Sequence, residues 1–234
     1  MSEEGWPLCY EPLDLLDAVP ESAPHERLWR YVLLNLRGVG ADLPAELLGR
    51  RLVGGLDDQA LDAHRRAFAA QSRQRSGGGY SQGRQPVSLP LAAQRARAGV
   101  AALQPDPRAA AAEVTRETRH RLQRDQCAWL KCLFANPFRA AGADPAWLTA
   151  TVLALARGVR ESGDFGAMPI LADALQDAGC DDEDVLTHCR DGSHVCGCWV
   201  VDLLLSGKEC GPFTPSGTGC SGPSRDGSRP PAPA

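Results

Sequence analysis

The segment DPRAAAAEVTRETRHRLQRDQCAWLKCLF, from Asp106 to Phe134, is typical of one long α-helix. Asp106 is a favourable N-cap, and Pro107 suits the first helical position, where its missing N–H has no helical partner in any case. The first half of the segment is rich in alanine and polar residues, so we expect it to contribute little to a core. Apolar residues of the second half share one face, which we expect to be buried: Leu122, Cys127, Leu130 and Phe134.

Helical patterns continue on both sides of this segment. Apolar residues recur at near-helical spacing, or helix start and stop signals occur, in several stretches: 11–19, 24–38, 43–55, 56–71, 91–104, 144–162, 168–179, 181–190 and 197–205. No alternating β-branched segment of useful length occurs in the N-terminal part. We therefore predict an all-α protein, an irregular array of helices with a compact C-terminal helical module.

Composition divides the chain into five expected segments. Ser72 to Pro90 is rich in Gly, Ser, Gln and Arg, which is typical of a flexible linker, and the Pro/Gly/Ser-rich C-terminus is typical of a disordered tail. The full set is an N-terminal helical region, a linker, Ala/Arg-rich helices, a C-terminal helical module and a tail: residues 1–71, 72–90, 91–135, 136–210 and 211–234.

The cellular compartment is predicted from three features. No run of about 18 apolar residues occurs, so we expect no transmembrane helix and no membrane partner. The N-terminus opens acidic and lacks an apolar core segment, which is unlike a secretory signal. The chain has nine cysteines, an odd number, and reduced thiols or metal ligands fit such a chain better than a disulfide framework. These features predict a cytoplasmic protein.

Charge is distributed unevenly along the chain. Twelve arginines lie between Arg65 and Arg124 against three acids, whereas the region from Glu161 to Cys210 is strongly acidic. The basic part has only Phe68 and Tyr80 as aromatic residues, so it lacks the stacking platform typical of nucleic-acid binding. Nucleic acid is therefore an alternative partner that we do not favour. We expect the acidic region to be the contact face for a protein partner whose identity the sequence does not give.

The stretch HCRDGSHVCGCWVVDLLL, from His188 to Leu205, concentrates histidine and cysteine. Together with one cysteine upstream it offers a C-x8-C-x4-H-x3-C pattern. Thiolates and imidazoles are the ligands that structural zinc prefers. The metal hypothesis therefore predicts a zinc site with these four ligands: Cys180, Cys189, His194 and Cys198. Zinc is the only cofactor that the sequence suggests.

Other interpretations of this stretch remain open. His188 is a substitute ligand, although His188 and Cys189 cannot easily both bind because neighbouring residues on a helix diverge. The cysteines also suit simple core packing, since free cysteine is among the most buried residue types. His194, Cys198 and Asp202 are spaced by four and would form a Cys–His–Asp stripe on a helix. Such triads usually come from distant segments, so we predict no catalytic residue and lean against an enzyme.

Three C-terminal segments carry a resemblance to a known family: LFANPFRAAGADPAWLTATVLALARGV, MPILADALQDAGCDDEDVLTHCR and HVCGCWVVDLLLSGKE. With the opening WPLCYEPLDLLDAV, they resemble a large paralogous family of uncharacterised planctomycete proteins over most of residues 6–209. The chain departs from that family at Cys196, where arginine is typical, at Ser206, and in LLNLRG, where a Cys-Cys-Arg-Arg run is common. The resemblance implies no activity. The predicted function is a non-catalytic interaction or scaffold module, with a zinc-stapled module as the alternative.

Overall fold

The computed structural model describes residues 1–52, 58–75, 91–139, 142–191 and 193–205. These residues form eleven α-helices and two short 3-10 turns and contain no β-strand, so the predicted all-α fold is confirmed. The N-terminal helices are α1 (Gly5–Leu8), α2 (Pro12–Ala18), α3 (His25–Gly38), α4 (Asp42–Leu52), α5 (Asp58–Arg75), α6 (Leu91–Ala102) and α7 (Pro107–Leu133). The C-terminal elements are η1 (Pro145–Trp147), α8 (Ala150–Ser162), η2 (Phe165–Ala167), α9 (Met168–Asp177), α10 (Glu183–Arg190) and α11 (Trp199–Leu204).

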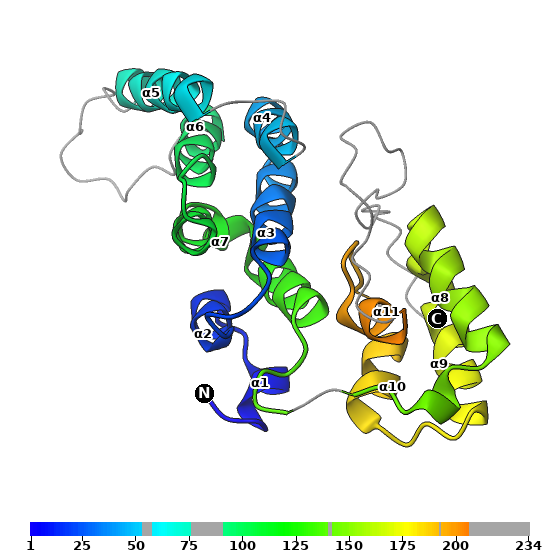
Figure 1. The fold of residues 1–234 in the computed structure, drawn as a ribbon. Helices are drawn as coiled ribbons and strands as arrows, with labels where there is room; N and C mark the ends of the chain where they lie inside the picture. Colours follow the sequence, from blue (N-terminus) through cyan, green and yellow to red (C-terminus); the bar gives the residue numbers. More distant parts are fainter. Residues whose placement is uncertain (53–57, 76–90, 140–141, 192, 206–234) are drawn as a thin grey trace, which may run out of the picture.

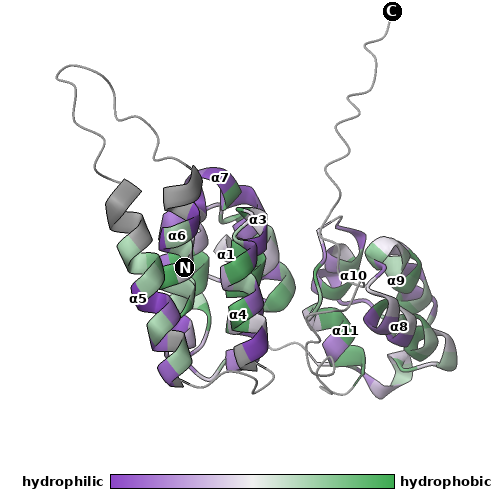
Figure 2. Cartoon of the chain, turned by 90° about the horizontal axis from the view of Figure 1, so that it is seen from above, coloured by the Kyte–Doolittle hydropathy of each residue, from purple (hydrophilic) through white to green (hydrophobic). Residues whose placement is uncertain are grey.

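The helices form two lobes that lie side by side (Figure 1, Figure 2). In the N-terminal lobe, α7 is central, because α2, α3 and α6 all pack against it, while α5 packs on α6 and α4 lies against α3 and α6. In the C-terminal lobe, α9 packs against α8 and α10, and α11 packs against α8 and α10. Buried apolar residues of both lobes belong to one core cluster, and Figure 2 shows apolar stretches on the helices of each lobe.

The first half of α7 belongs to the core, contrary to our expectation from its composition. Ala110, Ala111 and Val114 have no exposed surface. Alanine buries little area by itself, but its small side chain lets the backbones of neighbouring helices come close, and α2, α3 and α6 surround this part of α7. The expected burial of the second half is confirmed for all four apolar residues of its stripe.

Helix α7 is bent near its middle. Gln126 Nε2 donates to Thr118 Oγ1 at 2.8 Å and lies 3.4 Å from the Thr115 carbonyl oxygen. In a straight helix these residues would be separated by a rise of about 12 Å and about 16 Å, which is more than a glutamine side chain can span. The hydroxyls of Thr115 and Thr118 donate to the carbonyls of Ala111 and Val114, a pattern that bends helices. The second half of α7 therefore turns towards the C-terminal lobe (Figure 1).

Helix α7 begins where the sequence predicted, whereas α8 begins later than predicted. The Asp106 carboxylate accepts from the Ala109 N–H at 2.6 Å, as expected for the N-cap of α7. Asp144 and Pro145 were expected to open the next α-helix, but Asp144 caps only the 3-10 turn η1. Helix α8 begins later because the Thr149 hydroxyl accepts from the Val152 N–H and forms a second N-cap.

Two of the predicted segments fall mostly or wholly outside the described residues. Residues 76–90 of the predicted linker are not described, whereas residues 72–75 form the end of α5, so the helix runs further than expected. The predicted tail, residues 211–234, lies outside the described residues. Among the helices of the described part, none has the length and apolar character needed to cross a bilayer.

Candidate metal centre

Two cysteines and two histidines converge at the junction of the two lobes. Each offers one ligand atom, and these atoms all lie within 4.8 Å of one another. We call these four residues the metal group: Cys132, His188, His194 and Cys198. Both sulfurs are buried and both imidazoles are half-buried. Cysteine sulfur and histidine nitrogen in equal number are a ligand set typical of structural zinc.

Four different local structures position these side chains. Cys132 lies in the last turn of α7, and His188 lies in the last turn of α10. His194 belongs to the loop that follows, and Cys198 is the N-cap residue of α11. The α7 contribution comes from the N-terminal lobe and the other three from the C-terminal lobe (Figure 1). A metal ion in this group would therefore join the lobes.

The loop before Cys198 needs a glycine. Gly197 has a φ of +93°, a left-handed conformation that other residues rarely adopt. A Cβ atom built there would lie 3.2 Å from Arg30 Cδ and 3.2 Å from Leu133 Cδ2. Gly197 thus lets the loop pass close to α3 and α7. The loop is further fixed by Val195, whose N–H donates to Cys132 Sγ at 3.3 Å.

The distances within the group are close to those of a tetrahedral site. His188 Nε2 lies 3.3 Å from Cys198 Sγ, and His194 Nδ1 lies 4.0 Å from the same sulfur. Metal bonds of about 2.0–2.3 Å place tetrahedral ligand atoms roughly 3.3–3.8 Å apart. Side-chain rotations that move the ligand atoms by about an ångström would complete such a site.

The two thiols differ in their proton affinity. Burial alone would raise the pKa of Cys198, but hydrogen bonds from the Cys132 thiol and from both imidazoles outweigh it and hold the pKa well below the ordinary value. Burial, reinforced by the contact with Cys198, raises the pKa of Cys132. The pair therefore favours one thiolate, on Cys198. A buried negative charge is costly unless it is paired, and a divalent cation would pair it.

Aromatic side chains enclose the imidazoles. The rings of His188 and His194 meet edge to face with centroids 4.9 Å apart. Phe165 stacks on His194 at 5.9 Å, and Trp199 lies 5.3 Å from His188. His194 Nε2 is buried and has no hydrogen-bond partner in the described part of the chain. A buried polar atom of this kind calls for a partner such as a water molecule. Because His194 turns Nδ1 towards Cys198, an ion in the group would not be that partner.

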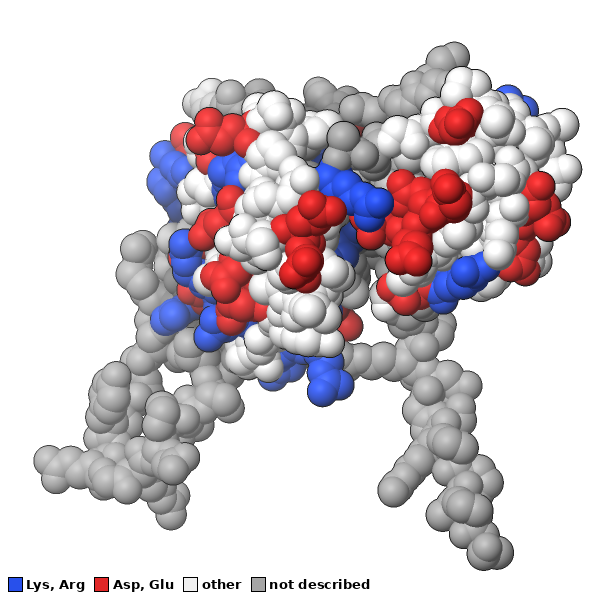
Figure 3. Space-filling view, turned by 90° about the horizontal axis from the view of Figure 1, so that it is seen from below, with Lys and Arg blue, Asp and Glu red and all other residues white. Residues whose placement is uncertain are grey.

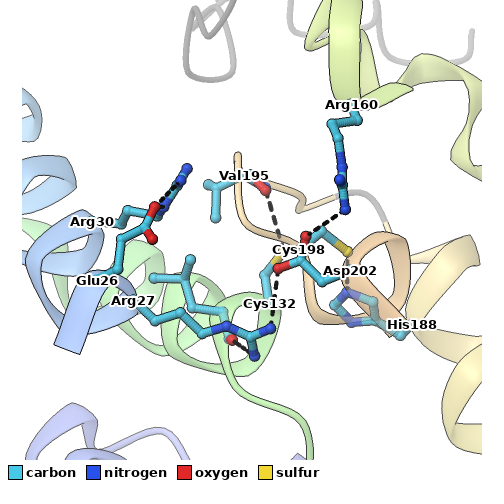
Figure 4. A network of polar contacts seen from close by, with 10 residues as sticks. Glu26, Arg27, Arg30, Cys132, Arg160, His188, Val195, Cys198 and Asp202 are labelled. Atoms are coloured by element: carbon cyan, nitrogen blue, oxygen red, sulfur yellow. Dashed lines mark hydrogen bonds and ion pairs between the residues drawn. The ribbon is translucent and has the colours of Figure 1, made fainter. Parts of the chain in front are cut away.

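A buried charge cluster lies beside the metal group. Asp202 is 5% exposed, and its carboxylate accepts from Arg27 at 3.0 Å and from Arg160 at 3.4 Å (Figure 4). Burial raises the pKa of Asp202, and the two guanidinium groups counteract that rise. Arg27 also donates to the Leu133 carbonyl at 2.9 Å, next to Cys132 in the chain. This cluster fixes α11 against α3 and the end of α7.

The Cys–His–Asp stripe considered from the sequence does not form. The Asp202 carboxylate contacts arginines rather than an imidazole, so it orients neither histidine. Cys198 is 1% exposed, which leaves little room for a substrate at its sulfur. A nucleophilic thiol needs a base, an orienting group and access. Of these three, only a base is present, in the imidazoles beside Cys198.

The structure places the four predicted ligands in different surroundings. His194 and Cys198 belong to the metal group, whereas Cys180 and Cys189 do not. Cys180 is buried in the turn that precedes α10, and His188 lies in the last turn of that helix. Cys180 therefore packs beside α10 and does not contribute a ligand atom to the group.

His188, and not Cys189, contributes the ligand atom from α10, whereas the sequence pattern had favoured Cys189. Neighbouring residues of an α-helix point about 100° apart, so only one of the two can face the group. Helix α10 is rotated so that His188 faces it, and Cys189 is fully buried outside it. Burial raises the pKa of Cys189 strongly, which is the behaviour of a thiol that packs as a small apolar side chain.

Cys132 was missed because its sequence context is that of a core residue. It lies on a long helix more than fifty residues before His188, and the sequence near it lacks a second metal-binding residue type at ligand spacing. The one available signal was the pair of cysteines, Cys127 and Cys132, near the end of a mostly polar helix. That signal does not distinguish ligands from core residues.

Two arginines of the basic region serve as internal hydrogen-bond donors. Arg108 donates to the carbonyls of Leu16, Val19 and Pro20 at the end of α2. Arg95 donates to the Val39 carbonyl after α3 at 2.9 Å. Cations at helix C-termini satisfy the last carbonyls and complement the helix dipole. These contacts give the arginine excess a role in the fold.

Comparisons of the chain with protein-family models, with curated proteins and with solved structures found no match. The resemblance to a planctomycete family therefore stays a prediction, and the site is interpreted from its own geometry.

Proposed function

We propose that this protein is a non-catalytic helical module whose two lobes are fastened together by a structural zinc ion. The observation that carries the proposal is the convergence of Cys132 from α7 with three ligands from the C-terminal lobe. All four protein ligands would occupy the tetrahedral positions, which is typical of structural rather than catalytic zinc. With four protein ligands, no coordination position would remain for a substrate.

The proposal is tested by the metal content of purified full-length protein, measured by elemental mass spectrometry under reducing conditions. We expect about one zinc per chain. Substitution of the metal by Co²⁺ adds an independent readout, because cobalt bound to two thiolates in a tetrahedral site gives characteristic visible absorption. Metal-free wild-type protein that stays folded would contradict the proposal.

Matched cysteine variants separate the two possible ligand sets. Cys132→Ser removes a ligand of the structural group, whereas Cys180→Ser removes a buried cysteine that only the sequence pattern included. We expect zinc to be lost in the first variant and retained in the second. The opposite result would favour the sequence pattern over the geometry.

The proposal includes a protein partner that contacts the acidic side of the C-terminal lobe, in the cytoplasm, where free thiols stay reduced. Acidic side chains predominate on this lobe when it is viewed from below (Figure 3). From Glu161 onwards the exposed acids of the described part are Glu161, Asp164, Asp173, Asp177, Asp181, Glu183 and Asp191. Partner capture should fail for Asp173→Asn with Asp177→Asn and persist for Asp14→Asn with Asp17→Asn. Equal capture by both double variants would contradict this surface.

A further inference from the structure

The two sulfurs of the metal group come from different lobes and lie close together. The sulfur atoms of Cys132 and Cys198 are among the ligand atoms that lie within 4.8 Å of one another. A disulfide needs the sulfurs about 2.05 Å apart. Formation of the bond therefore requires the two sulfurs to move towards each other, and rotation of the side chains about their Cα–Cβ bonds is the movement that brings them closer.

We propose that hydrogen peroxide converts Cys132 and Cys198 into a disulfide and that this bond expels the zinc ion. The inference rests on the zinc binding proposed above and adds its regulation. Thiolates bind zinc, whereas the sulfurs of a disulfide carry no negative charge and are poor ligands. The two imidazoles that remain are too few to hold the ion.

The chemistry balances with peroxide as the oxidant. One thiolate attacks a peroxide oxygen, the O–O bond breaks, and the leaving hydroxide takes up a proton to give water and a sulfenic acid. The second thiolate attacks that sulfur and displaces a second hydroxide, which also leaves as water. Overall, two thiolates, one peroxide and two protons give one disulfide and two waters, and Zn²⁺ is released.

Cys198 is the sulfur that meets the oxidant first. Both imidazoles contact Cys198, at 3.3 Å and 4.0 Å, and these half-buried rings are the members of the group that reach towards solvent. Cys132 has no exposed surface, and its sulfur accepts a hydrogen bond from the Val195 N–H. The burial of both sulfurs also selects the oxidant, because peroxide is small enough to reach them and glutathione disulfide is not.

The disulfide would keep the lobes joined after the metal has gone. Cys132 ends α7 in one lobe and Cys198 begins α11 in the other, so a covalent bond replaces the metal bridge at the same place. The protein would thus release zinc under oxidation without separating its lobes. A reduced, metal-free chain would have neither connection.

The experiment uses reduced, zinc-loaded full-length protein with a known zinc content. Peroxide is added in steps, released zinc is measured with a chromogenic chelator, and cysteine linkages are identified by peptide mass spectrometry. We expect zinc release in proportion to a Cys132–Cys198 linkage. The matched control is Cys9→Ser, which removes a half-buried cysteine outside the group and should respond as the wild type does.

Four outcomes would contradict the inference or one of its parts. Zinc bound at the start and retained after peroxide would refute the expulsion while leaving the proposed function intact. Zinc released with a different cysteine linkage would refute the assigned pair. Protein without zinc at the start would refute both the regulation and the proposed function. Zinc release by glutathione disulfide at the same rate as by peroxide would refute the selection of oxidant by burial.

Discussion

Arg27 and Asp202 are 175 positions apart in sequence, yet the Arg27 guanidinium donates to the Asp202 carboxylate at 3.0 Å. Arg27 lies in the first turn of α3 and Asp202 lies in α11, so this ion pair connects the first long helix of the chain to the last described one. The same guanidinium also binds the Leu133 carbonyl at the end of α7. One side chain therefore holds three elements that surround the metal group (Figure 4).

Removal of this connection should destabilise the protein. Arg27→Met keeps the apolar stem and removes the guanidinium, so we expect the free energy of unfolding to fall by about 2 kcal/mol, the value of hydrogen bonds to a charged group. Urea unfolding measures this change. Arg190→Met is the matched control, because Arg190 pairs with an exposed carboxylate at 3.7 Å and should cost less than about 0.5 kcal/mol. Equal losses in the two variants would refute the role of Arg27.

The bend of α7 depends on Gln126. Its amide donates to Asn35 Oδ1 at 2.6 Å and to Thr118 Oγ1 at 2.8 Å inside the N-terminal lobe. Gln126→Ala removes both bonds and leaves a cavity, so we expect a loss of about 2–3 kcal/mol in urea unfolding. Gln123→Ala changes an exposed glutamine of the same helix and should cost less than about 0.5 kcal/mol. A small effect at Gln126 would mean that the threonines alone bend the helix.

Tyr31 should make the protein sensitive to alkaline pH. Burial raises the pKa of its hydroxyl, against the opposing effect of hydrogen bonds to Thr115 and Asn35. The unfolded chain releases this proton at about pH 10 while the folded chain keeps it, so stability is full below that pH and falls as the pH rises above it. Tyr31→Phe should weaken this fall. Unfolding curves from pH 8 to 11 measure it, and unchanged pH dependence in the variant would contradict the assignment.

Substitution by alanine should change the free energy of unfolding in opposite directions at two glycines. Gly197→Ala places a Cβ against Arg30 and Leu133 at a positive φ, so we expect a loss of about 1–3 kcal/mol and weaker zinc binding in chelator competition. Gly158→Ala adds a Cβ in α8 with no atom within 4 Å, so we expect a gain of about 0.5–1 kcal/mol. Zinc binding unchanged by Gly197→Ala would show that the loop does not set the metal geometry.

Two of the four residues of the metal group could be predicted from the sequence. His194 and Cys198 follow from their spacing, because three intervening residues keep both in one short loop and cap. The choice between His188 and Cys189 depends on how α10 is rotated, and that rotation is set by packing against α9 and α11. The spacing of residues along the chain does not tell how a helix is rotated about its axis, so it cannot distinguish two neighbours that point about 100° apart.

The helical class and much of the local detail follow from residue type and local spacing. Periodic apolar residues, the Asp106 cap and the left-handed Gly179 that ends α9 are all encoded by neighbours within a turn or two. Three features do not follow from local sequence: the burial of the alanine-rich half of α7, the bend of that helix, and the approach of Cys132 to Cys198. Each of these depends on contacts between segments far apart in the chain. Residue type and spacing carry no information on where such segments meet.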